Sequence, residues 1–121
     1  MQTLSALDYT LTALADPTRR AILQRLSRGE TRVTDVAEPF AMSLNAVSKH
    51  IRVLERAQLV QRRRVGREHF LSANLAPLAE ATAWMEKQRS IWGARLEVLD
   101  ALLEAEDRAN TTTRTKRGRP R

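Results

Sequence analysis

The chain has 121 residues, of which 42% are hydrophobic and 4% aromatic, with a formal net charge of +7 and a pI near 11.2. This length allows one domain with its own core and is too short for two ordinary domains. Because the chain has no cysteine, disulfides, thiolate metal sites and cysteine nucleophiles are excluded. It opens with neither a basic leader nor a long apolar run, so we expect no signal peptide, no membrane span and a cytoplasmic location.

The basic charge lies in two separate segments. Residues 1–74 contain 12 Lys and Arg against 7 Asp and Glu, and residues 108–121 contain 6 against none, whereas residues 75–107 contain 3 against 7. A basic balance favours an anionic partner, although many basic proteins use such charge only for solubility.

The first predicted element is an amphipathic helix of about three turns, because leucines recur there at intervals of three and four residues. These leucines are Leu4, Leu7, Leu11 and Leu14. Asp16 and Pro17 then supply an N-cap and a first helical residue for a second helix, which should stop before Gly29. Thr34 is the expected N-cap of a short third helix, which Pro39 should end or distort.

A fourth helix is predicted from Ser43, as its N-cap, to about Ala57. Its apolar positions fall on one side at helical spacing, and polar or basic residues fall on the opposite side. The apolar set is Leu44, Val47, Ile51 and Leu54. The polar and basic set is Asn45, Lys49, Arg52 and Arg56.

Residues 59–65 and 68–72 predict two short strands joined by a hairpin turn at Gly66 and Arg67. Alternation along a strand places Arg63 on the face opposite to Arg62 and Arg64.

A last, long helix is predicted from Asn74, as its cap, to about Asp107. Its apolar residues cover an arc wide enough to serve two partners at once, the core of its own chain and a second copy. With the leucines of the first helix, they predict a homodimer interface. The predicted interface residues are Leu4, Leu7, Leu11, Trp84, Ile91, Trp92, Leu99 and Leu102.

The basic segment 108–121 has no apolar periodicity, so residues 1–107 form the predicted folded domain and residues 108–121 a disordered tail. Its end, KRGRPR at residues 116–121, is similar to an AT-hook, in which Arg117 and Arg119 would lie in a narrow A·T minor groove. A solubilising tail with only nonspecific attraction to phosphate is the alternative.

The order of a short helix, a turn, a capped helix with a basic outer face and a basic hairpin predicts a mainly helical, winged helix-turn-helix fold that binds double-stranded DNA. Asn45 suits an adenine edge, Lys49 and Arg52 can reach guanine or phosphate, and Arg56 suits a phosphate. The other expected contacts are Ser43, Ala46, Ser48, Arg63, Arg64 and Arg67. The alternatives are a solvated helix face and an edge strand made soluble by its charge.

Two segments carry a family resemblance: LADPTRRAILQRLSRGE at residues 14–30 and MSLNAVSKHIRVLERAQLVQRRRVGR at residues 42–67. They resemble the ArsR/SmtB family of bacterial winged-helix repressors. The resemblance implies a nucleoid-associated homodimer that pairs through its first and last helices and binds an inverted repeat in a promoter, often its own. It also implies release from DNA on a signal, which the sequence does not identify.

The chain departs from the metal-sensing members of that family, because it lacks cysteine and has only His50 and His69. It is similar instead to the metal-independent branch, so no metal or other cofactor is expected. His50 should hydrogen bond within the domain or to phosphate, and His69 is most simply a strand residue of the hairpin. Ser48 and His50 point in different directions on one helix, so we expect no enzyme.

The leading functional hypothesis is a site-specific repressor. The alternatives are an architectural protein that binds DNA with little sequence preference and an interaction module that no longer binds DNA.

Overall fold

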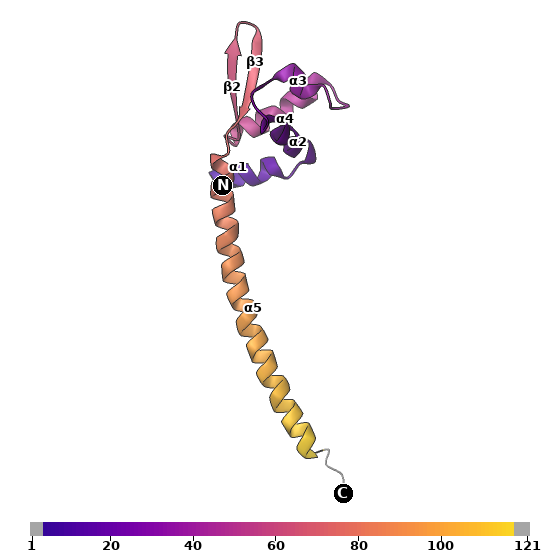
Figure 1. The fold of residues 1–121 in the computed structure, drawn as a ribbon, viewed down its shortest axis with the longest axis vertical. Coiled ribbons are helices and arrows are strands. Elements are labelled where there is room, and N and C mark those ends of the chain that lie inside the picture. The colour runs from indigo at the N-terminus through magenta and orange to yellow at the C-terminus, as the bar shows by residue number, and fades with distance from the viewer. Residues whose placement is uncertain (1–3, 118–121) are drawn as a thin grey trace. The chain divides into compact units, whose positions relative to one another are not determined.

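The computed structural model describes residues 4–117 of the chain, and their side chains as far as residue 111. It is mostly helical with one small antiparallel sheet (Figure 1). It divides into two compact units, residues 1–83 and 84–121. The elements are α1 (Ala6–Leu14), α2 (Pro17–Leu26), β1 (Thr31–Arg32), α3 (Val33–Ala37), α4 (Leu44–Arg56), β2 (Val60–Val65), β3 (Glu68–Ala73) and α5 (Ala76–Arg117).

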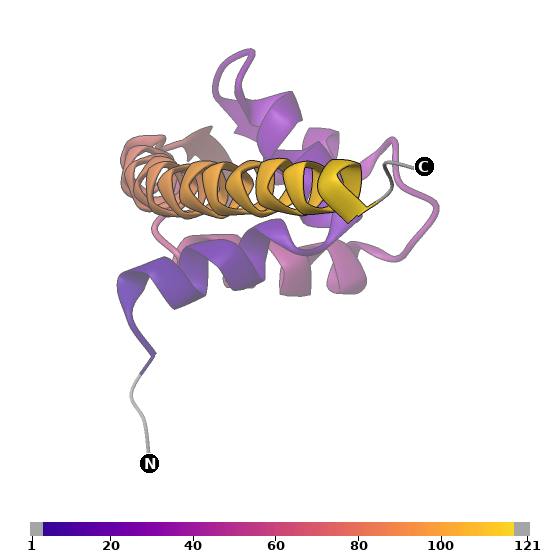
Figure 2. The same ribbon diagram turned by 90° about the horizontal axis from the view of Figure 1, so that it is seen from below.

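The first two helices begin at side-chain caps. Ser5 and Asp8 form a capping box, in which the Ser5 hydroxyl accepts from the Asp8 amide at 3.2 Å and the Asp8 carboxylate accepts from the Ser5 amide at 2.9 Å. Leu4, which the sequence places in the first helix, therefore lies just outside α1. Asp16 caps α2 through the Arg19 amide at 3.1 Å, as expected, and α2 ends before Gly29. The helices α1, α2 and α4 contact one another within the first unit (Figure 2).

The start of α3 differs from the prediction. Arg32, not Thr34, is the N-cap, and it caps without a side-chain hydrogen bond. Arg32 belongs to β1, which pairs with Leu71 and Phe70 of β3 and holds the chain extended up to Val33. The helix can therefore begin only at Val33, and it ends at Ala37, before Pro39 as predicted.

The sheet is antiparallel with the strand order β1-β3-β2. Its β2–β3 hairpin, residues 60–73, is the wing; both strands lie within one residue of their predicted bounds. Val65 pairs with Glu68 across the turn, where Gly66 has a φ of +62°. A positive φ at the first of two central turn residues is the pattern of a type II′ hairpin, which favours glycine. The strand β1 was not predicted, because two residues are too few to show a sequence period.

The core of the first unit lies where α2, α4 and the sheet meet. Ile22, Val47, Ile51, Leu54 and Leu71 are fully buried. Burying side chains of this size stabilises the fold by about 1.5–3 kcal/mol each. Leu44, predicted on the same apolar side of α4, is instead 50% exposed, because it stands in the first turn and beyond the core.

The helix α5 is longer than predicted. It continues through residues 108–117, past the expected end near Asp107. The division into a folded domain and a disordered basic tail stays a prediction. No glycine or proline interrupts residues 108–117. Residues 118–121, with the predicted DNA contact Arg119, lie outside the described residues; Arg117 ends α5.

At its other end, α5 is joined to the turn that follows α4. Asn74 lies two residues before α5 and accepts from the Ala76 amide at 3.4 Å, while its side-chain amide donates to the Gln58 carbonyl at 2.8 Å. In the described part of the chain, no helix has both the length and the apolar character needed to cross a membrane.

Candidate nucleic-acid interface

The helix α4 presents its basic face to solvent, as its sequence predicts. The Ser43 hydroxyl accepts from the Ala46 amide at 3.1 Å and begins the helix. Burial of Val47, Ile51 and Leu54 sets the rotation of the helix. The opposite side therefore carries four exposed polar or basic residues, Asn45, Lys49, Arg52 and Arg56. We call α4 the recognition helix.

Three other predicted contacts on the recognition helix have less free surface. Ser43 is exposed, although its hydroxyl already accepts the capping hydrogen bond. Ala46 and Ser48 are half-buried. Ser48 lines a cavity, so its side chain is accessible from the side of the helix that faces α3 and the wing.

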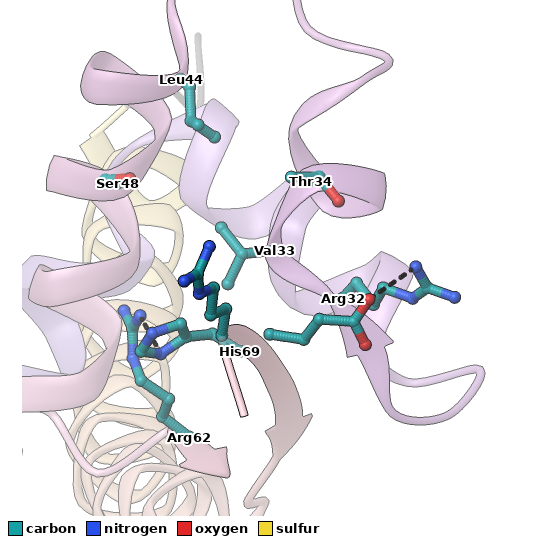
Figure 3. Close-up of a pocket in the computed structure, with 9 residues that line it drawn as sticks. Arg32, Val33, Thr34, Leu44, Ser48, Arg62 and His69 are labelled. Atoms are coloured by element: carbon teal, nitrogen blue, oxygen red, sulfur yellow. Dashed lines mark hydrogen bonds and ion pairs between the residues drawn. The ribbon is translucent and has the colours of Figure 1, made fainter. Parts of the chain in front are cut away.

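A cavity of about 370 Å³ lies between α3, the recognition helix and the wing (Figure 3). It brings together Ser48 and Arg67, two predicted contacts from distant parts of the chain. Sequence reasoning missed two further lining residues, Arg32 and Thr34, because their position depends on the short strand β1. The full lining is Arg32, Val33, Thr34, Leu44, Ser48, Arg62, Arg67, Glu68 and His69.

The three consecutive arginines of β2 have different partners. Arg62 donates to Glu55 of the recognition helix at 2.8 and 3.2 Å and to His69 Nδ1 at 3.2 Å, which joins the wing to that helix. Arg64 donates from Nε to the Gly66 carbonyl at 2.9 Å. These contacts stiffen the wing and leave the Arg64 guanidinium without an ion pair among the described residues.

Arg63 lies on the other face of β2, as alternation predicts. It forms a bidentate ion pair with Glu30 at 2.6 and 3.1 Å, and its guanidinium stands 5.0 Å from the centre of the Phe70 ring. This hydrogen bonding holds the pKa of the Glu30 carboxyl below its ordinary value and raises the pKa of Arg63. Arg63 is thus paired with Glu30 in the unbound protein, which the sequence did not indicate.

Four of the predicted cations differ from Arg63 in having no ion-pair partner among the described residues. In the part of the chain that the structure describes, no carboxylate lies within ion-pair distance of Lys49, Arg52, Arg56 or Arg67. Arg32, by contrast, pairs with Glu68 at 3.2 Å. The recognition helix and the wing tip therefore carry the positive charge that is available to phosphate.

His50 is held inside the domain, one of the two positions expected for it. Arg19 donates to His50 Nδ1 at 3.2 Å and to the carbonyls of Thr12 and Ala13 at 2.9 Å each. Asp16 lies 3.8 Å from the same imidazole nitrogen. Arg19 thereby connects the end of α1 to the recognition helix, a role that no sequence pattern indicated.

Comparisons with known proteins agree with this geometry. A helix-turn-helix domain model matches residues 14–63. The chain is 33% identical to an HTH-type transcriptional regulator of Mycobacterium tuberculosis, over 88% of this chain and 96% of that protein. It is 36% identical to the transcriptional repressor SdpR of Bacillus subtilis, over 60% of this chain and 81% of that repressor.

Solved structures give the same result. A crystal structure of an ArsR family transcriptional regulator matches with a TM-score of 0.71 and 38% identity, over 76% of this chain and 95% of that one. An ArsR-like regulator from Rhodococcus sp. RHA1 matches with a TM-score of 0.70 and 30% identity, over 80% of this chain and 92% of that one. The chain belongs to the ArsR/SmtB family. It is a DNA-binding transcriptional regulator of the winged helix-turn-helix type.

The residues predicted for an ArsR/SmtB dimer interface are mostly exposed. In α1, Leu4 and Leu11 are exposed and Leu7 is half-buried. The α5 members are exposed, with Trp92 58% and Leu102 63% accessible, and Arg95 lies 5.6 Å from the centre of the Trp92 ring. The remaining α5 members are Trp84, Ile91 and Leu99.

The described residues of this ArsR/SmtB chain were searched for side chains that could bind a metal ion. They contain no cluster of three or more His, Cys, Asp or Glu side chains that could hold an ion. The expectation that DNA binding needs no metal stays a prediction.

Proposed function

We propose that this regulator is a homodimeric, sequence-specific repressor that binds an inverted-repeat operator, with its own promoter as one candidate. The observation that carries the proposal is the exposed face of the recognition helix. Asn45 and Lys49 stand in its first half without an ion-pair partner among the described residues, where side chains of such helices reach base edges.

The wing supports the same proposal. Arg67 stands at its tip and shares a cavity with Ser48 of the recognition helix, so a DNA backbone that followed the helix would meet both. Contacts to phosphate set position and add affinity, whereas Asn45 and Lys49 supply the discrimination between sequences.

Two copies are needed to read an inverted repeat, and the exposed apolar residues of α1 and α5 support a dimer. Nonpolar side chains the size of Trp92 and Leu102 seldom gather in such number on a surface that stays in water. A dimer links two half-site contacts and so raises affinity for DNA that carries both.

Binding to mapped genomic fragments, in competition with random DNA, tests the proposal. Asn45→Ala or Lys49→Ala should cost about 1–3 kcal/mol at the operator and less on random DNA. Lys87→Ala, an equal change of charge on α5, is the matched control and should leave specificity unchanged. If both recognition-helix variants are neutral and deletion of residues 114–121 abolishes binding, an architectural role replaces the repressor.

A further inference from the structure

The cavity between α3, the recognition helix and the wing lies within one unit of the chain. All of its lining residues belong to the first unit, so one core positions all of its walls. Leu44 and Ser48 project from the recognition helix on one side of it, and Val33 and Thr34 of α3 lie across from them (Figure 3). Its volume of about 370 Å³ is within the range of about 300–1,000 Å³ that is typical of small-molecule sites. The cavity is therefore large enough for an organic ligand.

One positive charge of the lining has no carboxylate partner among the described residues. Arg32 is paired with Glu68 at 3.2 Å, and Arg62 has its own glutamate partner on the recognition helix at 2.8 Å. His69 adds no charge, because its Nδ1 accepts a hydrogen bond from Arg62 and a protonated imidazole has no acceptor. Arg67 is then the one unpaired cation of the lining within the described part of the chain. The cavity therefore suits a ligand with a single negative charge.

The lining also offers free hydroxyl groups and apolar surface. The hydroxyls of Ser48 and Thr34 have no hydrogen-bond partner among the described residues, so each can donate to a ligand. Val33 is half-buried and Leu44 is 50% exposed, and both line the cavity. Covering these two side chains with an apolar group is favourable, because it removes apolar surface from water. A phosphate group has no such surface, so the lining fits an anion with an apolar body better.

We propose that this cavity binds a small organic monocarboxylate, with its carboxylate on Arg67 and its apolar body over Val33 and Leu44. The planar guanidinium of Arg67 can donate two parallel hydrogen bonds to the two carboxylate oxygens. Ser48 and Thr34 can donate to the carboxylate or to a polar substituent of the ligand. The cavity alone carries this binding, whether or not the chain recognises an operator.

The acid and DNA should compete for the cavity. Arg67 and Ser48 line it and are also expected contacts of the DNA backbone, whose phosphodiesters carry the same single charge. This competition rests on the proposed repressor function and would release the protein from its operator. If the two ligands exclude each other, the apparent dissociation constant for DNA should rise about tenfold when the acid is present at about nine times its own dissociation constant.

Two-dimensional NMR of the backbone amides of the full chain, without DNA, tests the site directly. The probes are benzoate, phenylacetate and octanoate; benzamide, which lacks the charge, and inorganic phosphate, which lacks the apolar body, are the controls at equal ionic strength. At least one acid should shift the amides of Thr34, Leu44, Ser48 and Arg67 in a saturable way at millimolar concentration. Both controls should bind about tenfold more weakly or worse. No saturable shift with any acid, or equal binding of phosphate, would overturn the proposal.

Substitutions locate the acid and separate its site from DNA binding. Arg67→Ala should weaken binding of the acid about tenfold or more, and Leu44→Ala and Thr34→Val about threefold each. Arg56→Ala, which removes an unpaired arginine that does not line the cavity, is the matched control and should leave the affinity for the acid unchanged.

Thr34 is not an expected DNA contact, so Thr34→Val should weaken the effect of the acid on DNA binding while DNA affinity without the acid stays the same. An acid that binds the cavity but leaves DNA affinity unchanged would refute the competition. A chain that binds the acid but shows no operator preference would refute the proposed repressor and support the site.

Discussion

Arg63 and Arg67 of the wing should contribute very differently to DNA binding, although the sequence predicts both as DNA contacts. Arg63 is held by two hydrogen bonds to Glu30, whereas Arg67 at the wing tip has no carboxylate partner among the described residues. A phosphate can bind Arg67 at once. It can bind Arg63 only after displacing Glu30, so the counterion released at Arg63 is offset by a broken ion pair.

The difference can be measured as a salt dependence. Each phosphate contact adds about 0.9 to the slope of log affinity against log salt, which corresponds to about a 3.5-fold change in affinity between 50 and 200 mM salt. Arg67→Ala should therefore lower the slope by about 0.9 and Arg63→Ala should leave it nearly unchanged. Fluorescence anisotropy with a labelled duplex of random sequence gives both slopes directly.

Glu30→Gln completes the comparison. It frees Arg63, so the slope should rise by about 0.9, and the same substitution made together with Arg63→Ala should have no such effect. If Arg63→Ala lowers the slope as much as Arg67→Ala does, Glu30 does not compete with phosphate for Arg63.

Three further predictions concern stability. Ser43→Ala should cost about 1 kcal/mol in urea unfolding, because it removes the cap on the Ala46 amide; an unchanged midpoint would show that another group caps α4. Gln58→Gly should stabilise the protein by about 1 kcal/mol in thermal unfolding, since Gln58 has a φ of +62°. Backbone amides lower the pKa values of Asp8 and Asp16, so these carboxylates stabilise the fold above the unfolded pKa near 3.9. Stability should therefore fall as the pH drops below about 4, and less so when both are replaced by Asn.

Most elements could be predicted because their signals are local. Asp16 and Pro17 mark the start of α2, Ser43 marks the start of α4, and Gly66 marks the hairpin turn. The start of α3 could not be predicted in the same way. It depends on β1, and β1 exists only through its pairing with β3, some forty residues further along the chain.

In the candidate site, too, features set by one segment could be predicted and contacts between distant segments could not. Helical spacing placed Lys49 and Arg52 on the exposed face of the recognition helix, because that spacing is a property of one segment. The partners of Arg63 and His50 are Glu30 and Arg19, more than thirty residues away in the chain. A sequence period contains no information about such distant pairs. Charge and residue type therefore identified the surface, but not which of its cations are free.

The single helix of the second unit has a thermodynamic consequence for the regulator. A single helix is only marginally stable in water by itself, and Thr111, Thr112 and Thr113 are weak helix formers. Residues 84–117 should therefore be fully helical only in the proposed homodimer, so that folding of this segment and association become one equilibrium. Helicity measured by circular dichroism should then rise with protein concentration. The abundance of the regulator would govern how much of each molecule is folded, as well as how many promoters it occupies.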